Sequence, residues 1–170
     1  KVNEITSEIE KVIAGKADVI KKVMTAILAG GHILLEDVPG VGKTTLALAF
    51  SKVMGMSFRR VQFTPDVVPS DIVGFTMYDK QKNKFTYHEG AAMCNFFLAD
   101  EINRTSSKTQ SALLEVMQEG KTTVDGQEHM LPHPFIVMAT QNPIGTAGTQ
   151  MLPEAQLDRF MIKLSMGYPD

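Results

Sequence analysis

The sequence predicts an α/β fold with a mainly parallel five-stranded sheet, flanked by helices and carrying two inserted β-hairpins. Short apolar runs, as expected for strands buried on both faces, alternate along the chain with segments of helical periodicity. Two further pairs of strand-like segments surround polar turns and lie outside that alternation, which marks them as hairpins. The five sheet strands are predicted at residues 32–36, 57–63, 94–99, 134–140 and 161–165.

The chain is predicted to open with two helices. Apolar residues recur at helical spacing along the first of them: Ile5, Ile9, Val12 and Ile13. Gly15 interrupts this pattern, which resumes over residues 19–28 and ends at Gly30 and Gly31. We therefore expect residues 1–29 to form N-terminal helices that precede a core at residues 30–170.

Later helices and both hairpins follow from local signals. Helices are predicted at residues 43–53, 106–118 and 153–160, with a short broken helix at 64–74, which holds two prolines. Gly55 ends the first of these, and Thr105 or Ser106 caps the second. One hairpin pairs 75–78 with 85–88 across the polar stretch DKQKNK. The other pairs 121–124 with 127–131 across an Asp-Gly turn.

The composition describes an ordinary globular domain of 170 residues, 44% hydrophobic and 21% charged. A net charge of −2 argues against a domain that grips nucleic acid, because such domains carry a basic excess. Cys94, the single cysteine, lies in an apolar run, so we expect a buried thiol in a reducing, cytoplasmic protein. No stretch approaches the ~18 apolar residues of a membrane helix, and no signal peptide is evident. The four histidines have no metal-ligand spacing.

A candidate phosphate-binding loop lies between the first predicted strand and the helix that follows it. Its glycines allow a tight turn whose amides point at phosphate oxygens, and the helix N-terminus adds partial positive charge. Lys43 would reach the β- and γ-phosphates, and the Thr44 hydroxyl would serve Mg²⁺. Asp37 stands where the strict pattern has glycine. The predicted nucleotide-binding residues are Pro39, Gly40, Val41, Gly42, Lys43, Thr44 and Thr45.

Two carboxylates end the apolar strand that contains residues 94–99. A buried strand delivers such side chains to the carboxyl edge of the sheet, beside the phosphate loop. Asp100 would hold Mg²⁺, directly or through water, and Glu101 would polarise an attacking water as a general base. A carboxylate aimed at water favours hydrolysis over transfer to a small-molecule acceptor, for which no site is evident.

These residues resemble AAA+ ATPases, and most closely the MoxR family. The strings that carry the resemblance are GGHILLEDVPGVGKT, RRVQFTPDVVPSDIVG, LADEINRTSSKTQSALLEVMQEG, VMATQNP and LPEAQLDRF. They run in the family's order from about residue 30 to the end of the chain. The resemblance implies a P-loop NTPase three-layer fold of AAA+ type, with ATP or ADP and Mg²⁺ as ligands.

The resemblance also implies roles for residues outside the phosphate-binding loop and the acidic strand end. Asn142 matches the sensor 1 residue, which contacts the attacking water or the γ-phosphate; a turn-forming Asn before Pro143 is the alternative. Arg159 matches the arginine finger that reaches a neighbour's ATP; a solvated arginine at a helix end is the alternative. Arg104 is an interface or relay candidate.

Further expectations rest on the family alone. Val12 and Ile13 resemble the segment that packs on adenine, with core packing as the alternative. The two hairpins resemble inserts that face the pore or the client protein. The helical lid with its sensor 2 residue is expected to be absent, because the sequence stops where that lid would begin. The intact protein is expected to form a homo-oligomeric ring, a hexamer in this family.

Three functions stay open at this point. The leading one is a chaperone-like ATPase that remodels or matures a partner protein of unknown identity. A nucleic-acid motor is disfavoured, because the hairpin KTTVDGQEHML has one lysine against Asp125 and Glu128. The motor subunit of a metal chelatase is a close relative by its insertions.

Overall fold

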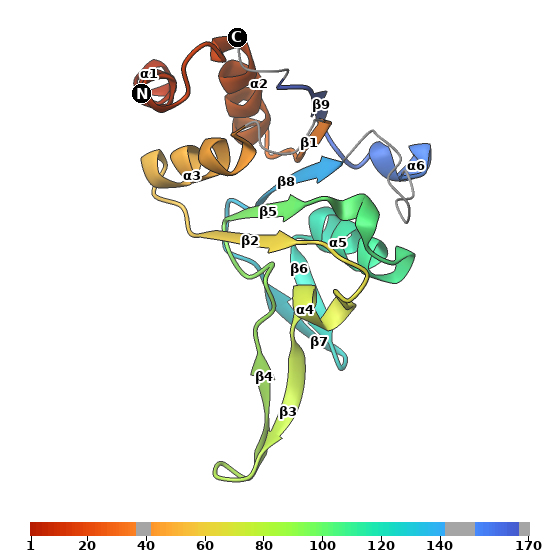
Figure 1. Cartoon of the computed structure of the whole chain (residues 1–170). Helices are drawn as coiled ribbons and strands as arrows, with labels where there is room; N and C mark the ends of the chain where they lie inside the picture. The colour runs from red at the N-terminus through yellow and green to blue at the C-terminus, as the bar shows by residue number, and fades with distance from the viewer. Residues whose placement is uncertain (37–41, 142–151, 167–170) are drawn as a thin grey trace.

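The computed structural model describes residues 1–36, 42–141 and 152–166, and it confirms the predicted α/β fold. Five strands form one sheet in the order β2-β5-β8-β1-β9, and all four neighbouring pairs are parallel. Helices cover both faces of this sheet (Figure 1). Its strands are β1 (Ile33–Glu36), β2 (Phe58–Gln62), β5 (Phe96–Asp100), β8 (Ile136–Gln141) and β9 (Ile162–Leu164).

The helices lie close to their predicted positions, and none in the described part of the chain is long and apolar enough to cross a membrane. The last predicted helix, 153–160, is wrong in length, because only one turn forms. Phe160 is instead buried in the core, and the Met161 N–H donates to the His32 carbonyl at 2.9 Å. The helices are α1 (Val2–Val12), α2 (Ala17–Leu28), α3 (Lys43–Val53), α4 (Pro69–Val73), α5 (Ser107–Glu119) and α6 (Glu154–Leu157), with a 3-10 turn η1 (Ile102–Arg104).

Alternate residues of the central strands pack into two separate cores. One core joins the sheet to α1, α2 and α3 through strand residues Ile33, Leu35, Phe96, Leu98, Ile136 and Met138. The other joins it to α5 through Leu34, Phe97, Ala99, Val137 and Ala139. Both faces are covered, so every residue of β8 and every residue of β5 except Asp100 is buried, which explains why the apolar starts of their sequences predicted buried strands.

Helix α5 has clear signals at both ends. The Ser106 hydroxyl accepts a hydrogen bond from the Thr109 N–H at 3.3 Å, so Ser106 and not Thr105 is the N-cap. Gly120 ends the helix with a φ of 66°, a left-handed conformation that costs glycine little. This helix covers the sheet face opposite α3.

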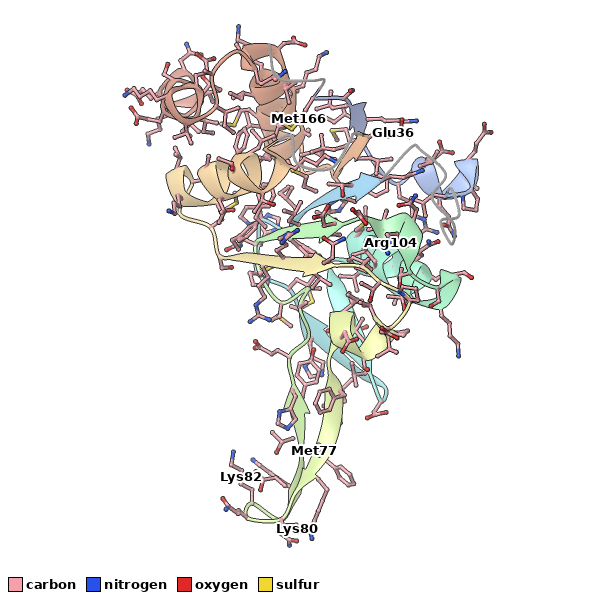
Figure 2. All side chains as sticks on the ribbon, in the orientation of Figure 1. Glu36, Met77, Lys80, Lys82, Arg104 and Met166 are labelled. Carbon is pink, nitrogen blue, oxygen red and sulfur yellow. The ribbon has the colours of Figure 1, made fainter. Side chains whose placement is uncertain are left out.

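The two hairpins are separate from the sheet, as predicted. In the first, β3 (Phe75–Asp79) pairs with β4 (Lys84–His88), and the hairpin projects away from the body of the molecule (Figure 1). The Met77, Lys80 and Lys82 side chains lie toward its far end (Figure 2). In the second, β6 (Lys121–Val124) pairs with β7 (Gln127–Met130), and both residues of its Asp-Gly turn have positive φ, as the turn signal predicted.

His32 is buried, and its ring links strand β8 to helix α5. Its Nδ1 accepts a hydrogen bond from the Val137 N–H at 2.9 Å, and its Nε2–H donates to the Met117 carbonyl at 3.0 Å. The ring therefore bridges β8 and α5 in its neutral form. Burial lowers the pKa of His32 from its ordinary value of 6.5, although the bond to Met117 opposes that shift.

We expect this histidine to make the protein acid-sensitive. The unfolded chain takes up a proton at His32 at a higher pH than the folded chain, so the free energy of unfolding should fall as the pH drops below about 6.5. The slope should approach, at most, about 1.4 kcal/mol per pH unit. Denaturant unfolding between pH 7.5 and 5.5 would measure it. His32→Gln should flatten this part of the profile, whereas His88→Gln, at an exposed site, should not. Parallel profiles for His32→Gln and the unaltered protein would contradict the assignment.

Cys94 is buried, as predicted from the sequence. Burial raises the pKa of its thiol to about 11, so little thiolate is present at neutral pH. The residue precedes β5 instead of starting it, because that strand runs from Phe96 and includes Asp100. The predicted strand 94–99 was therefore two residues early at its start and one residue short at its end.

Candidate active site

The carboxyl ends of the parallel strands lie along one edge of the sheet, and α3 packs against β5. The arrowheads of β2, β5 and β8 point to the same side in Figure 1. Arg104, just beyond β5, lies on that side in Figure 2. The residues that the sequence singled out as acids therefore end up at the edge where a parallel sheet binds its ligands.

The start of α3 has the local structure that a phosphate site requires. Gly42 precedes the helix with a φ of 78°, a left-handed conformation that glycine adopts without a steric penalty. Lys43 and Thr44 open the helix and are half-buried, whereas Thr45 is exposed. The first N–H groups of a helix lack partners within it, so this end can receive an anion. The other predicted loop residues, Pro39, Gly40 and Val41, lie outside the described residues.

Asp100, the last residue of β5, has a carboxylate fixed by two donors. Its side chain is 17% exposed. The Thr140 hydroxyl donates to Oδ1 at 2.5 Å, and Nη2 of Arg60 donates to Oδ2 at 2.7 Å. Both partners come from neighbouring strands, Thr140 from β8 and Arg60 from β2. The carboxylate is thus held in one direction at the sheet edge.

Glu101 leaves the strand through a sharp bend. Its backbone has φ 55° and ψ 54°, a left-handed conformation that costs a non-glycine residue about 1–2 kcal/mol. The Glu101 N–H donates to the Thr140 hydroxyl at 2.8 Å, so Thr140 holds both acidic residues. Its carboxylate is 18% exposed and pairs with Nη1 of Arg104 at 3.1 Å. Backbone strain of this kind, here at Glu101, is typical of functional sites.

The sequence interpretation missed Thr140 and Arg60. Thr140 ends the apolar stretch FIVMAT, and its polarity next to a predicted strand end was a signal that could have been used. Arg60 gave no such signal, because it lies in an alternating segment with a second arginine beside it. Only the register of β2 on β5, with Gln62 opposite Asp100, brings Arg60 to the acid.

The candidate metal ligands are of a kind that suits magnesium. They are the Thr44 hydroxyl in the first turn of α3 and the Asp100 carboxylate at the end of β5, both hard oxygen donors. Among the residues that the structure describes, no group of three or more His, Cys, Asp or Glu side chains could hold a metal ion. Mg²⁺ keeps several waters and binds through one or two protein ligands plus substrate phosphates, so this sparse set fits it.

Comparison with known proteins decides the family. The model of the ATPase family associated with various cellular activities (AAA) matches residues 32–162. Chaperone MoxR1 of Mycobacterium tuberculosis is 48% identical over 162 residues, which are 95% of this chain and 43% of that protein. Protein MoxR of Methylorubrum extorquens is 32% identical over 95% of this chain and 48% of that protein. This chain belongs to the MoxR family of AAA+ ATPases.

Two further matches cover nearly the whole chain. YeaC of Bacillus subtilis is 55% identical over 168 residues, which cover 99% of this chain and 52% of that protein. A crystal structure from Cytophaga hutchinsonii, of a protein described as a candidate ATPase, superposes with a TM-score of 0.89 at 46% identity. It covers 99% of this chain and 51% of that one. The chain therefore spans about half the length of the relatives it matches.

Arg159, the finger candidate of this MoxR chain, is exposed. It follows α6 on the surface, and its Nη1 donates to Oε1 of Gln118 on α5 at 2.5 Å. Met117, Gln118, Asp158 and Arg159 line an open hollow of about 340 Å³. The described part of the chain thus presents the arginine outward, with its guanidinium positioned by Gln118.

Two adenine candidates have different surroundings. Ile13 packs against the core beneath α1–α3, whereas Val12 is 62% exposed. The prediction that Val12 belongs to the apolar face of α1 was therefore wrong, because Ile5, Ile9 and Ile13 supply that face. An adenine contact for either residue stays a prediction. Asn142, the sensor 1 candidate, lies just beyond β8 and outside the described residues.

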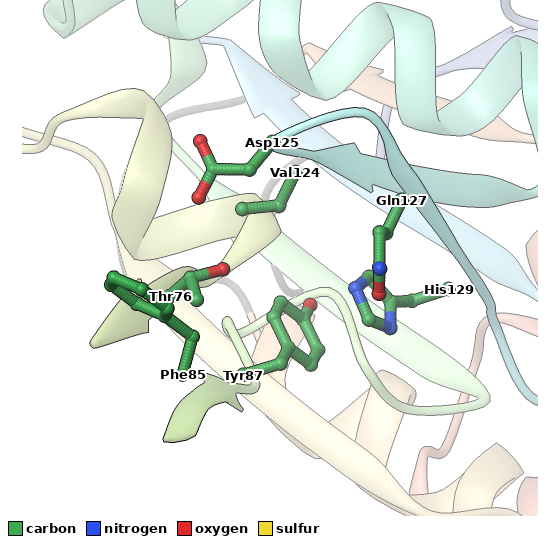
Figure 3. A pocket seen from close by; sticks show the side chains of 7 residues that line it. All are labelled: Thr76, Phe85, Tyr87, Val124, Asp125, Gln127 and His129. Atoms are coloured by element: carbon green, nitrogen blue, oxygen red, sulfur yellow. The ribbon is translucent and has the colours of Figure 1, made fainter. Parts of the chain in front are cut away.

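Residues of both hairpins line a second hollow, and all of them are distant in sequence from the phosphate loop. It has a volume of about 410 Å³, and Tyr87 of β4 stacks on His129 of β7 with ring centres 3.6 Å apart (Figure 3). The Tyr87 hydroxyl also donates to the Val73 carbonyl at 2.5 Å. The lining residues are Thr76, Phe85, Tyr87, Val124, Asp125, Gln127 and His129.

Proposed function

We propose that this chain binds ATP with Mg²⁺ and hydrolyses it as the motor core of a chaperone-like MoxR protein. The strongest support is the hydrogen-bond network in which Thr140 joins Asp100 and Glu101 at the carboxyl ends of the strands. It presents one acid for a cation and a second, differently directed acid for water. The start of α3 supplies the opposite charge that a triphosphate needs.

The residues divide the work of hydrolysis. Lys43 and the amides before and within the first turn of α3 hold the phosphates, with Gly42 permitting their approach. Glu101 takes a proton from the attacking water, and the Thr140 hydroxyl holds the bent backbone of Glu101 by accepting its N–H. Asn142 would orient the same water. Bound through Thr44 and Asp100, Mg²⁺ would neutralise charge on the β- and γ-phosphate oxygens.

Arg159 is proposed to act in trans. Charge builds on the γ-phosphoryl oxygens in the transition state, and Lys43 covers only one side of them. An arginine offers a planar, permanently charged donor set for the open side. Its outward position beside Gln118 supports a role toward a neighbouring subunit. A head-to-tail ring, a hexamer in this family, would give every site one finger.

The partner is proposed to be a protein that ATP cycles remodel or mature. One relative, MoxR1 of Mycobacterium tuberculosis, is named as a chaperone. The hollow between the hairpins offers an aromatic surface for a client protein. Phe85 at this hollow is 72% exposed. A nucleic-acid motor and a chelatase motor are the weaker alternatives, and cytoplasmic location stays a prediction.

The ring proposal has a direct test with the protein at its natural length. Arg159→Ala and Lys43→Ala should each remove ATPase activity, the first by withholding a finger and the second by emptying the loop. When the two variants are mixed, some sites combine an intact loop with an intact neighbouring finger, so phosphate release should partly return. If co-assembly is demonstrated by crosslinking and no activity returns, Arg159 does not act in trans.

A further inference from the structure

The carboxylate of Asp100 already forms an ion pair with an arginine of its own chain. Nη2 of Arg60 lies 2.7 Å from Oδ2, while Thr140 donates to Oδ1 at 2.5 Å. Both oxygens of the proposed Mg²⁺ ligand are therefore engaged by protein donors. The same Nη2 also donates to Oε1 of Gln62, at 3.1 Å.

The register of the sheet places Arg60 there. Arg60 lies opposite Leu98 and Gln62 opposite Asp100 in the parallel pair of β2 and β5. Since side chains two residues apart share a face, Arg60, Gln62 and Asp100 all lie on the face of Leu98. Leu98 belongs to the core beneath α3, so this is the face of the sheet that α3 covers.

Arg60 can leave this position at little cost. β2 is an edge strand, and the Arg60 side chain is 43% exposed. The guanidinium is the exposed member of this pair, so water solvates its charge once it separates, while the Thr140 hydroxyl still donates to the 17% exposed carboxylate. Gln62 offers the guanidinium a second acceptor when Oδ2 is given up. The pair thus joins a fixed carboxylate to a movable cation.

A guanidinium and a hydrated Mg²⁺ that shared Oδ2 would repel each other at this distance, because both are cations. We propose that Arg60 is a positioning residue that competes with Mg²⁺ for Asp100. This inference rests on the proposed nucleotide function. When Mg²⁺ binds together with nucleotide, it displaces Arg60 from Oδ2 of Asp100 toward Gln62 and solvent. Arg60 thereby sets the Mg²⁺ concentration at which the site loads.

The variant Arg60→Gln removes the competing charge and keeps a polar side chain. Arg59→Gln is a matched control, because Arg59 is equally exposed at 43%, lies on the opposite face of the strand, and contacts Gly90 and Glu89 instead. The measurement is binding of a fluorescent ADP analogue at fixed concentration while Mg²⁺ is titrated. The Mg²⁺ midpoint should fall about three- to tenfold in Arg60→Gln and stay unchanged in Arg59→Gln.

Thermal unfolding adds a second readout. Without nucleotide, Arg60→Gln should melt close to the temperature of the unaltered protein, because the exposed guanidinium contributes little to stability. With ADP and a Mg²⁺ concentration between the two midpoints, the variant should melt at the higher temperature, since its site is the more fully loaded. If Arg60→Gln does not fold, Arg60→Lys keeps a charge but loses the planar fork, and its Mg²⁺ midpoint should also fall, by a smaller factor.

A midpoint equal to or above that of the unaltered protein, in whichever of these variants folds, would overturn the competition. That result would refute only the role of Arg60 if the analogue still bound and Lys43→Ala abolished its binding. Absence of Mg²⁺-dependent binding in the unaltered protein would instead refute the proposed nucleotide function together with this inference.

Discussion

Replacing Glu101 with glutamine should leave ATP bound while turnover falls on the order of a hundredfold or more, the scale of a lost general base. The amide keeps the shape of the side chain and can still accept a bond from Arg104, but it cannot take a proton from water. The backbone bend at Glu101 is held by Thr140, which the substitution does not touch. Binding and chemistry should therefore separate cleanly.

Phosphate release and nucleotide retention, measured on the protein at its natural length, would test this expectation. Glu4→Gln provides a control for loss of one carboxylate, because that side chain lies in α1 and is 82% exposed. Hydrolysis by Glu101→Gln near the unaltered rate would assign water activation to another residue. Loss of ATP binding in the same variant would mean that Glu101 stabilises bound ATP before hydrolysis as well as the transition state of the reaction.

Replacing Lys43 with alanine should abolish measurable ATP binding. The lysine opens α3 directly after Gly42, where its charge and the helix N-terminus act on the same phosphates. With that charge removed, the amides alone must balance three phosphates, which the proposed function places near Asp100 and Glu101. We expect this repulsion to dominate, so that binding is lost rather than weakened.

Titration with a fluorescent ATP analogue would measure the effect, with circular dichroism to confirm that the variant is folded. Lys52→Ala is the matched control, because Lys52 lies in the last turn of the same helix and is exposed. Unchanged affinity in a folded Lys43→Ala variant would remove the basis for the phosphate loop. Equal losses in both lysine variants would point to a general effect of charge instead of a site.

The fold was predictable because its main signals are local. Strands β5 and β8 each begin with four apolar residues, and α5, a helix with an apolar face, lies between them in the sequence, which favours a covered parallel sheet. The Asp-Gly turn and the DKQKNK turn set both hairpins in place. The errors concern boundaries: β5 extends to Asp100, and the helix after Pro153 stops at Leu157, where packing of Phe160 overrides local propensity.

The sequence by itself determined the family, the phosphate loop and the acidic pair, because each is carried by neighbouring residues whose spacing fixes their chemistry. Only the tertiary structure decided which side chains surround them. Thr140 is 40 residues from Asp100, and Arg60 is equally distant on the other side. They meet the acid because parallel strands β2, β5 and β8 are in register at one sheet edge, and no short segment of sequence encodes the pairing of strands so far apart.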